Sequence, residues 1–105
     1  MNDNFKCIYR ILKSLEEELD SLTFDINKIS PNELGISEAR WAKYIEMMLD
    51  VGYIKGIRVY YDVNEELEVD NQGIKITLKG LEYLSENTIM QRMYKTFMNF
   101  KDAVK

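Results

Sequence analysis

The sequence has no histidine and only one cysteine, Cys7, and these shortages exclude several kinds of site. Without histidine, the chain lacks the commonest general base and the usual metal ligand. A lone cysteine forms no disulfide within the chain and cannot supply the roughly four Cys or His ligands of a structural zinc site. Most simple enzyme mechanisms are therefore disfavoured, and we expect a non-enzymatic protein that needs no metal or other cofactor.

Long apolar runs and an excess of basic charge are also missing. Charged residues recur too often for a membrane span of about 18 apolar residues. The N-terminal Met-Asn-Asp-Asn-Phe-Lys does not have the basic and then apolar build of a signal peptide. The 14 Lys and Arg residues face 18 Asp and Glu residues, which gives a net charge of -4. We therefore expect a cytoplasmic protein with no membrane partner and no overall attraction to polyanions.

The apolar content of the sequence suits one globular domain. Apolar residues make up 46% of the 105 residues, which is enough for one hydrophobic core in a chain of this length. No internal repeat or low-complexity tract divides the sequence. We therefore expect a single domain over residues 1–105, in which residues 88–105 form an appended C-terminal helix.

The beginning of the chain shows two different hydrophobic periods. Apolar residues at alternating steps of three and four predict a helix over residues 4–20. Residues 23–27 then alternate with period two, which favours a very short strand or an extended connector.

A helix-turn-helix is predicted next from local capping chemistry. Residues 30–33, Ser-Pro-Asn-Glu, place an N-cap hydroxyl, a proline at the first helical position and a glutamate three residues after the cap. A short helix therefore begins at Pro31, and Gly35 can adopt the positive φ that ends it. Ser37 is placed to cap a further helix over residues 38–50. Two helices joined by a short turn that contains glycine form a helix-turn-helix.

Two alternating segments then predict a β-hairpin. Apolar and polar residues alternate over residues 53–61 and again over residues 73–78. The polar connector over residues 62–72 is expected to be a protruding loop. Thr77 is placed to cap a following helix, which Asn87 ends.

This order of helix, short strand, helix-turn-helix, hairpin and helix is that of a winged helix-turn-helix domain. We therefore expect an α+β fold, with a three-helix core, a small antiparallel hairpin as the wing, and additional C-terminal helices.

Several stretches also resemble a known family. Residues 76–84 look like the strand-into-helix junction of bacterial winged-helix regulators. That junction and residues 34–37, 52–56, 86–90 and 94–95 resemble the YjcQ-like family of small proteins from Gram-positive bacteria and their phages. The resemblance spans nearly the whole chain and implies a winged-helix fold. It carries no defined activity onto individual residues, and a fold is not a function.

In a DNA-binding winged helix, the helix over residues 38–50 would enter the major groove. We expect its outward stripe to carry Arg40, Lys43, Tyr44 and Met47. Arg and Lys can bind guanine or phosphate, and Tyr can donate to phosphate. Lys55 and Arg58 in the following strand would extend a basic strip. The candidate DNA-binding residues are therefore Arg40, Lys43, Tyr44, Lys55 and Arg58.

The local charge favours a different function. Residues 30–50 hold two basic and four acidic residues, and residues 62–72 hold five acidic residues and no basic one. Carboxylates oppose contact with a phosphate backbone, whereas Lys and Arg favour it. The first hypothesis is a module that reads DNA with the helix over residues 38–50. The alternative is therefore a winged-helix protein-interaction module that uses the acidic wing and the face of the C-terminal helix and does not bind nucleic acid.

The acidic connector does not predict a calcium site. Acidic and amide residues stand at alternate positions from Asp62, as in an EF-hand. However, Leu67 occupies the position that requires glycine, and Gly73 occupies the position of the bidentate glutamate. A solvated loop that protects the edge of the hairpin is the simpler interpretation.

The final predicted helix is a candidate interface. Its apolar face carries Met90, Met93, Tyr94, Phe97 and Phe100. Methionine and aromatic residues are enriched at adaptable interfaces. This helix either packs on the first helix and completes the core or, if its face stays exposed, forms a symmetric homodimer.

Overall fold

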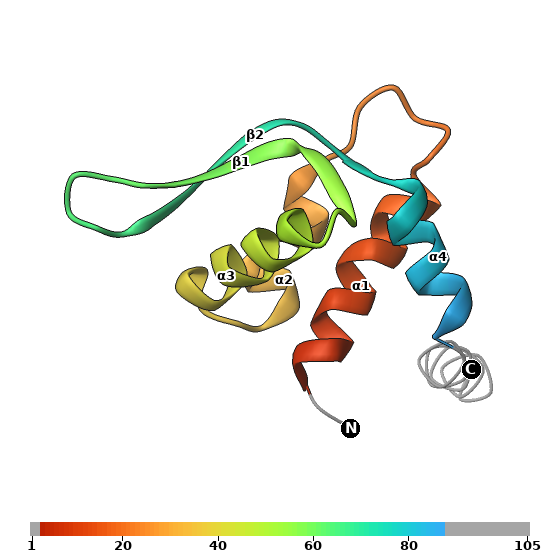
Figure 1. The fold of residues 1–105 in the computed structure, drawn as a ribbon, viewed down its shortest axis with the longest axis horizontal. Helices are drawn as coiled ribbons and strands as arrows, with labels where there is room; N and C mark the ends of the chain where they lie inside the picture. Colours follow the sequence, from red (N-terminus) through yellow and green to blue (C-terminus); the bar gives the residue numbers. More distant parts are fainter. Residues whose placement is uncertain (1–2, 88–105) are drawn as a thin grey trace.

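A computed structural model describes residues 3–87, which form an α+β fold (Figure 1). The helices are α1 (Asp3–Glu17), the 3-10 helix η1 (Ile26–Ile29), α2 (Pro31–Leu34), α3 (Glu38–Asp50) and α4 (Leu78–Glu86). Strands β1 (Ile54–Tyr61) and β2 (Leu67–Ile76) pair antiparallel into a two-stranded ribbon. Helix α1 lies between α3 and α4, and the ribbon reaches out beyond the helices (Figure 1).

The core lies where α1, α3 and α4 meet the base of the ribbon. Its most deeply buried side chains are Ile11, Leu12, Ile29, Ile45 and Met48. The ribbon contributes alternate apolar residues near its base, and α4 contributes Leu84. Each such side chain stabilises the fold by about 1.5–3 kcal/mol relative to an exposed position. Packing of these helices fixes the orientation of α3 and leaves one side of it exposed.

The predicted caps of the two helices within residues 30–50 are confirmed by their hydrogen bonds. Ser30 Oγ accepts from the backbone N–H of Glu33 at 3.3 Å, and Ser37 Oγ accepts from that of Arg40 at 3.1 Å. Between them, Gly35 ends α2 with a φ of 69°. Because side-chain caps satisfy otherwise unpaired N–H groups, these short elements begin where the sequence indicates.

Of the two alternatives for residues 23–27, a very short strand or an extended connector, the strand is wrong: residues 23–25 form a connector and η1 begins at Ile26. Asp25 instead caps η1, and its side chain accepts from the backbone N–H of Asn27 at 3.0 Å. Phe24 and Ile26 alternate with exposed neighbours because both pack partly against the core. The backbone groups of a strand also need a partner strand. The only sheet among the described residues consists of β1 and β2, so this segment has none.

The hairpin is longer than predicted, and its loop is shorter. Strand β2 begins at Leu67, which pairs with Tyr61, so only residues 62–66 of the expected loop remain outside the strands. The acidic residues of β2 alternate with Leu67 and Val69, and this period of two suits a ribbon with one solvated face. Leu78, expected at the end of the second strand, begins α4 after the Thr77 cap.

Residues 88–105 lie outside the described part of the chain. The candidate interface residues Met90, Met93, Tyr94, Phe97 and Phe100 fall there, as does the predicted appended helix. Within residues 3–87, no helix combines the length and the apolar character that crossing a membrane requires.

Candidate functional site

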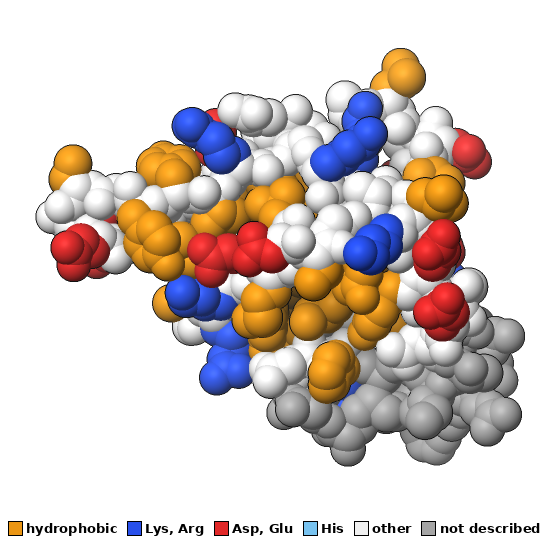
Figure 2. Space-filling view, in the orientation of Figure 1, with side chains coloured by type: hydrophobic (Ala, Val, Ile, Leu, Met, Phe, Trp, Pro, Cys, Tyr) orange, Lys and Arg blue, Asp and Glu red, His pale blue; other side chains and the backbone are white. Residues whose placement is uncertain are grey.

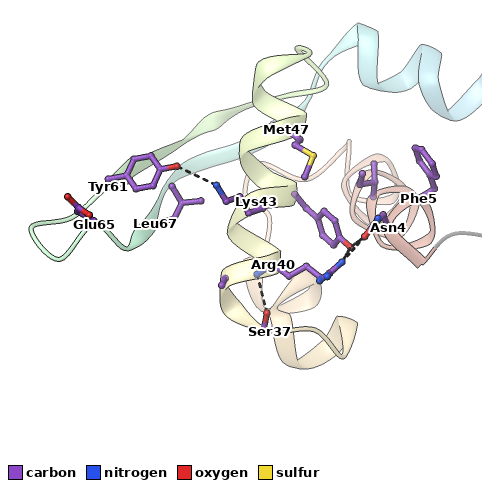
Figure 3. A pocket seen from close by; sticks show the side chains of 12 residues that line it. Asn4, Phe5, Ser37, Arg40, Lys43, Met47, Tyr61, Glu65 and Leu67 are labelled. Atoms are coloured by element: carbon purple, nitrogen blue, oxygen red, sulfur yellow. Dashed lines mark hydrogen bonds between the residues drawn. The ribbon is translucent and has the colours of Figure 1, made fainter.

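An open groove of about 820 Å³ follows the exposed side of α3 (Figure 3). It runs between the N-terminal turns of α1 and the outer part of the ribbon. Helix α1 lines it with Asn4, Phe5 and Ile8, and the ribbon lines it with Tyr61, Glu65 and Leu67. Helix α3 lines it with Ala39, Arg40, Lys43, Tyr44 and Met47, next to Ser37 of the cap. The groove therefore joins three of the five candidate DNA-binding residues to apolar side chains from two other elements.

Arg40 is held in place by two neutral groups. Its Nη1 donates to Asn4 Oδ1 at 2.9 Å and to the Tyr44 hydroxyl at 3.4 Å. The Tyr44 hydroxyl in turn donates to the same Asn4 oxygen. The network ties α3 to the first turn of α1 and fixes the guanidinium. Because an amide and a phenol carry no charge, they orient Arg40 without neutralising it.

Tyr44 does not lie on the outward stripe where the sequence analysis placed it. Its side chain is only 2% exposed, because its ring belongs to the core cluster. Its hydroxyl bonds to Asn4 on α1 and leaves the ring packed between the two helices. The helical spacing placed Tyr44 one turn from Arg40 on the outward stripe, but the neighbouring α1 covers it. Tyr44 therefore contributes to the groove by accepting a hydrogen bond that orients Arg40.

Lys43 lies on the ribbon side of α3. Its Nζ is 3.4 Å from the Tyr61 hydroxyl, 5.8 Å from the centroid of that ring and 3.7 Å from a carboxylate oxygen of Glu46. The Tyr61 hydroxyl raises the pKa of Lys43, and Glu46 adds to the effect. The Tyr44 hydroxyl likewise raises the pKa of Arg40. Both groups therefore remain cationic at neutral pH.

Lys55 and Arg58 are not brought to the groove. Arg58 lies over the ring of Tyr60, 5.0 Å from its centroid, and its Nη2 is 3.8 Å from Asp70. Successive side chains of a strand point to opposite faces, so Arg58 and Tyr60 lie on the face opposite Tyr61. The predicted basic strip from α3 into the first strand is therefore not continuous.

Acidic groups gather at the tip of the ribbon. Carboxylate oxygens of Asp62, Glu66 and Glu68 all lie within 4.8 Å of one another. Partial desolvation raises the pKa of Glu68, and the carboxylates of Asp62, Glu66 and Glu38 raise it further. Since Glu38 begins α3, acidic charge lies near the N-terminal end of the helix that was expected to read DNA.

Among the apolar residues of the groove, Met47 was expected on the outward stripe of α3, whereas the exposure of Phe5 was missed. The Phe5 side chain is 52% exposed and that of Met47 is 48% exposed. The apolar steps of three and four that predict the first helix include Phe5 and place it on the buried face, but Phe5 lines the groove instead. On the face shown in Figure 2, apolar side chains gather over the helices and the ribbon, and basic and acidic groups are interspersed. A large apolar residue in the first turn of a terminal helix is the signal that could have indicated this.

Comparison with known proteins confirms the family resemblance. A family model described as YjcQ protein matches residues 9–103. The uncharacterized protein YjcQ of Bacillus subtilis (strain 168) is 32% identical over 100 residues, which cover 95% of this chain and 96% of the relative. No solved structure matches the chain. The match over nearly the whole sequence shows that the chain belongs to the YjcQ family.

Proposed function

We propose that the protein is a non-enzymatic winged-helix module that binds another protein through the groove on α3. In this proposal, α2 and α3 are the helix-turn-helix, and the β1–β2 ribbon is the wing. The capped turn at Gly35 and the hairpin that follows α3 support this assignment. Because one fold serves many functions, the function is inferred from the residues that line the groove and not from the fold.

The observation that carries it is the mixed lining of the groove. Phe5, Met47 and Leu67 present apolar surface beside Arg40 and Lys43. Apolar surface with a few fixed polar groups is typical of sites that bind proteins or small ligands. A phosphate backbone would instead gain from a basic surface and lose from the acidic tip of the ribbon.

Two properties of the groove support a non-enzymatic role. A general base works best with a pKa near the operating pH. The pKa of Lys43 and that of Arg40 are raised, so neither group accepts a proton near neutral pH. The groove is also open to solvent, and Glu65 at its end is exposed. Such a site does not provide the desolvated environment that shifts a carboxylate toward acid-base work.

A second candidate function is DNA reading by α3. It is favoured by Arg40 and Lys43, which lie on the exposed side of the second helix of the proposed helix-turn-helix. This is the position from which such proteins contact base edges.

The two functions can be separated by the salt dependence of DNA binding. Fluorescence anisotropy of a labelled mixed-sequence duplex is measured against the full chain at low and at moderate salt. A protein-binding module is expected to leave the anisotropy unchanged at both. Salt-sensitive binding that is lost in an Arg40→Ala, Lys43→Ala variant would overturn the proposal and support DNA reading. A Lys55→Ala, Arg58→Ala variant removes the same charge outside the groove and is the matched control.

A further inference from the structure

We infer that the groove on α3 binds an acidic amphipathic segment of a partner protein. A carboxylate of that segment is held by Arg40, and its apolar side chains lie against Phe5, Met47 and Leu67. This inference rests on the proposed function and specifies the chemistry of the partner.

The first argument is the way Arg40 is held. Both of its contacts with Asn4 and Tyr44 use Nη1, whereas a guanidinium carries five N–H donors. The remaining donors suit the two oxygens of a carboxylate, with which arginine forms paired, charge-assisted hydrogen bonds. Fixing the side chain beforehand lowers the entropy lost when the partner binds. The groove therefore offers an oriented cation whose charge its neutral partners leave uncompensated.

The second argument is the spacing of charge and apolar surface. Arg40 and Lys43 are three residues apart on α3, and they lie between Phe5 on one side and Leu67 on the other (Figure 3). A segment that fits this surface places acidic residues at its centre and apolar residues on either side. An amphipathic helix laid into a groove presents such a pattern through its periodic anchors.

The acidic tip of the ribbon argues for a short acidic segment rather than an extended polyanion. A nucleic acid that ran along α3 would carry its phosphates toward Glu65 and the cluster of Asp62, Glu66 and Glu68. Repulsion between those phosphates and these carboxylates opposes binding. A protein segment can place a carboxylate at Arg40 and a neutral or basic residue near the tip. A uniformly basic segment would meet the opposite problem at Arg40 and Lys43.

The inference is tested by two-dimensional NMR of the isotope-labelled full chain with three defined probes. The first is a synthetic helical peptide with glutamates at the centre of its contact face, leucines on either side of them and glutamine at the other positions. The second carries lysine in place of every glutamate, and the third is a mixed-sequence DNA duplex. The glutamate peptide is expected to shift the backbone amides of Phe5, Arg40 and Leu67, and the lysine peptide is expected to leave them in place.

Two variants test whether Arg40 is the group that binds the carboxylate of the peptide. Arg40→Gln keeps a long polar side chain without the charge, and it is expected to weaken binding of the glutamate peptide about tenfold. Arg58→Gln removes the same charge from the opposite face of the ribbon and is expected to leave the affinity unchanged. The dispersion of each spectrum shows whether the variant has folded.

The possible failures are distinguishable. If the lysine peptide shifts the groove amides as strongly as the glutamate peptide, the acidic preference is wrong and the protein-binding groove stands. If neither peptide shifts them, the inference is overturned. If the duplex alone shifts them, the proposed function itself is wrong.

Discussion

The indole N–H of Trp41 donates to the backbone carbonyl of Ile29 across 2.7 Å. Trp41 lies in the first turn of α3, and Ile29 ends η1 with only 1% of its surface exposed. The bond therefore ties α3 directly to the segment before α2 and fixes the orientation of the helix that lines the groove.

Trp41→Phe keeps an aromatic ring at this site and removes its hydrogen-bond donor. The carbonyl of Ile29 then lacks that partner, and we expect the free energy of unfolding to fall by about 1–2 kcal/mol. Urea denaturation followed by circular dichroism measures the change. Tyr60→Phe, on the exposed face of the ribbon, is the control and should stay within about 0.5 kcal/mol of the parent. Equal effects of the two substitutions would show that the indole bond does not stabilise the fold.

The helix boundaries were largely predictable from the sequence because capping is local chemistry. Ser30, Ser37 and Thr77 each accept from an N–H three residues ahead, where the sequence alone places the partner. The 3-10 helix after Asp25 was missed because its residues also fit the alternating pattern of a strand. Among the described residues no strand pairs with this segment, and this excludes the strand. Such a decision depends on tertiary structure and not on the local sequence.

A second testable feature is the bulge at Gly56. Its φ is 77°, and a Cβ at this position would lie 2.1 Å from the carbonyl oxygen of Gly73. Gly56→Ala is therefore expected to destabilise the fold by about 2–5 kcal/mol, because it combines left-handed strain with a clash between backbones. Thermal unfolding measures the loss.

Gly35→Ala is the matched control for Gly56. Gly35 has a φ of 69°, but apart from its own chain neighbours no described residue has an atom within 4 Å of the position of an added Cβ. Only the strain of the left-handed region applies, so we expect a loss of about 1–2 kcal/mol. If Gly56→Ala costs no more than Gly35→Ala, the ribbon can adjust its bulge without breaking its register.

The acidic tip of the ribbon predicts a pH dependence. Partial desolvation and nearby carboxylates raise the pKa of Glu68 in the folded protein. The folded state then binds the proton more readily than the unfolded state, so this group reduces stability as the pH rises through its pKa. Glu68→Gln should therefore stabilise the protein at about pH 7 and make no difference at about pH 3. Denaturation midpoints at the two pH values, with Glu82→Gln on α4 as a control, test this expectation.

The Tyr44 hydroxyl is expected to act on binding through Arg40. Tyr44→Phe removes the acceptor 3.4 Å from Arg40 Nη1 and one donor to Asn4. We expect a loss of about 1 kcal/mol in stability. We also expect binding of an acidic peptide to be weaker than in the parent but stronger than in Arg40→Gln. Peptide titration and urea denaturation measure the two effects. Unchanged peptide binding would mean that Asn4 alone orients the guanidinium.

The groove was only partly predictable from the sequence. Arg40 and Lys43 were identified because a helical stripe can be read from spacing alone. The burial of Tyr44, the exposure of Phe5 and the separation of Arg58 from α3 depend on which element covers which face. Helix α1 is far from α3 in the sequence, and the ribbon, although it follows α3 directly, has to fold back along it, so no local pattern places their side chains beside α3.

The most direct test of the central claim is site-specific photo-crosslinking at the groove in living cells of the source organism. A benzophenone amino acid replaces Met47 in the groove or, as a control, Leu22, whose side chain is 99% exposed on the connector after α1. The account predicts a protease-sensitive, nuclease-resistant adduct at position 47 only, and loss of this adduct in the Arg40→Gln background. A nuclease-sensitive adduct at position 47, or equal protein adducts at both positions, would contradict it.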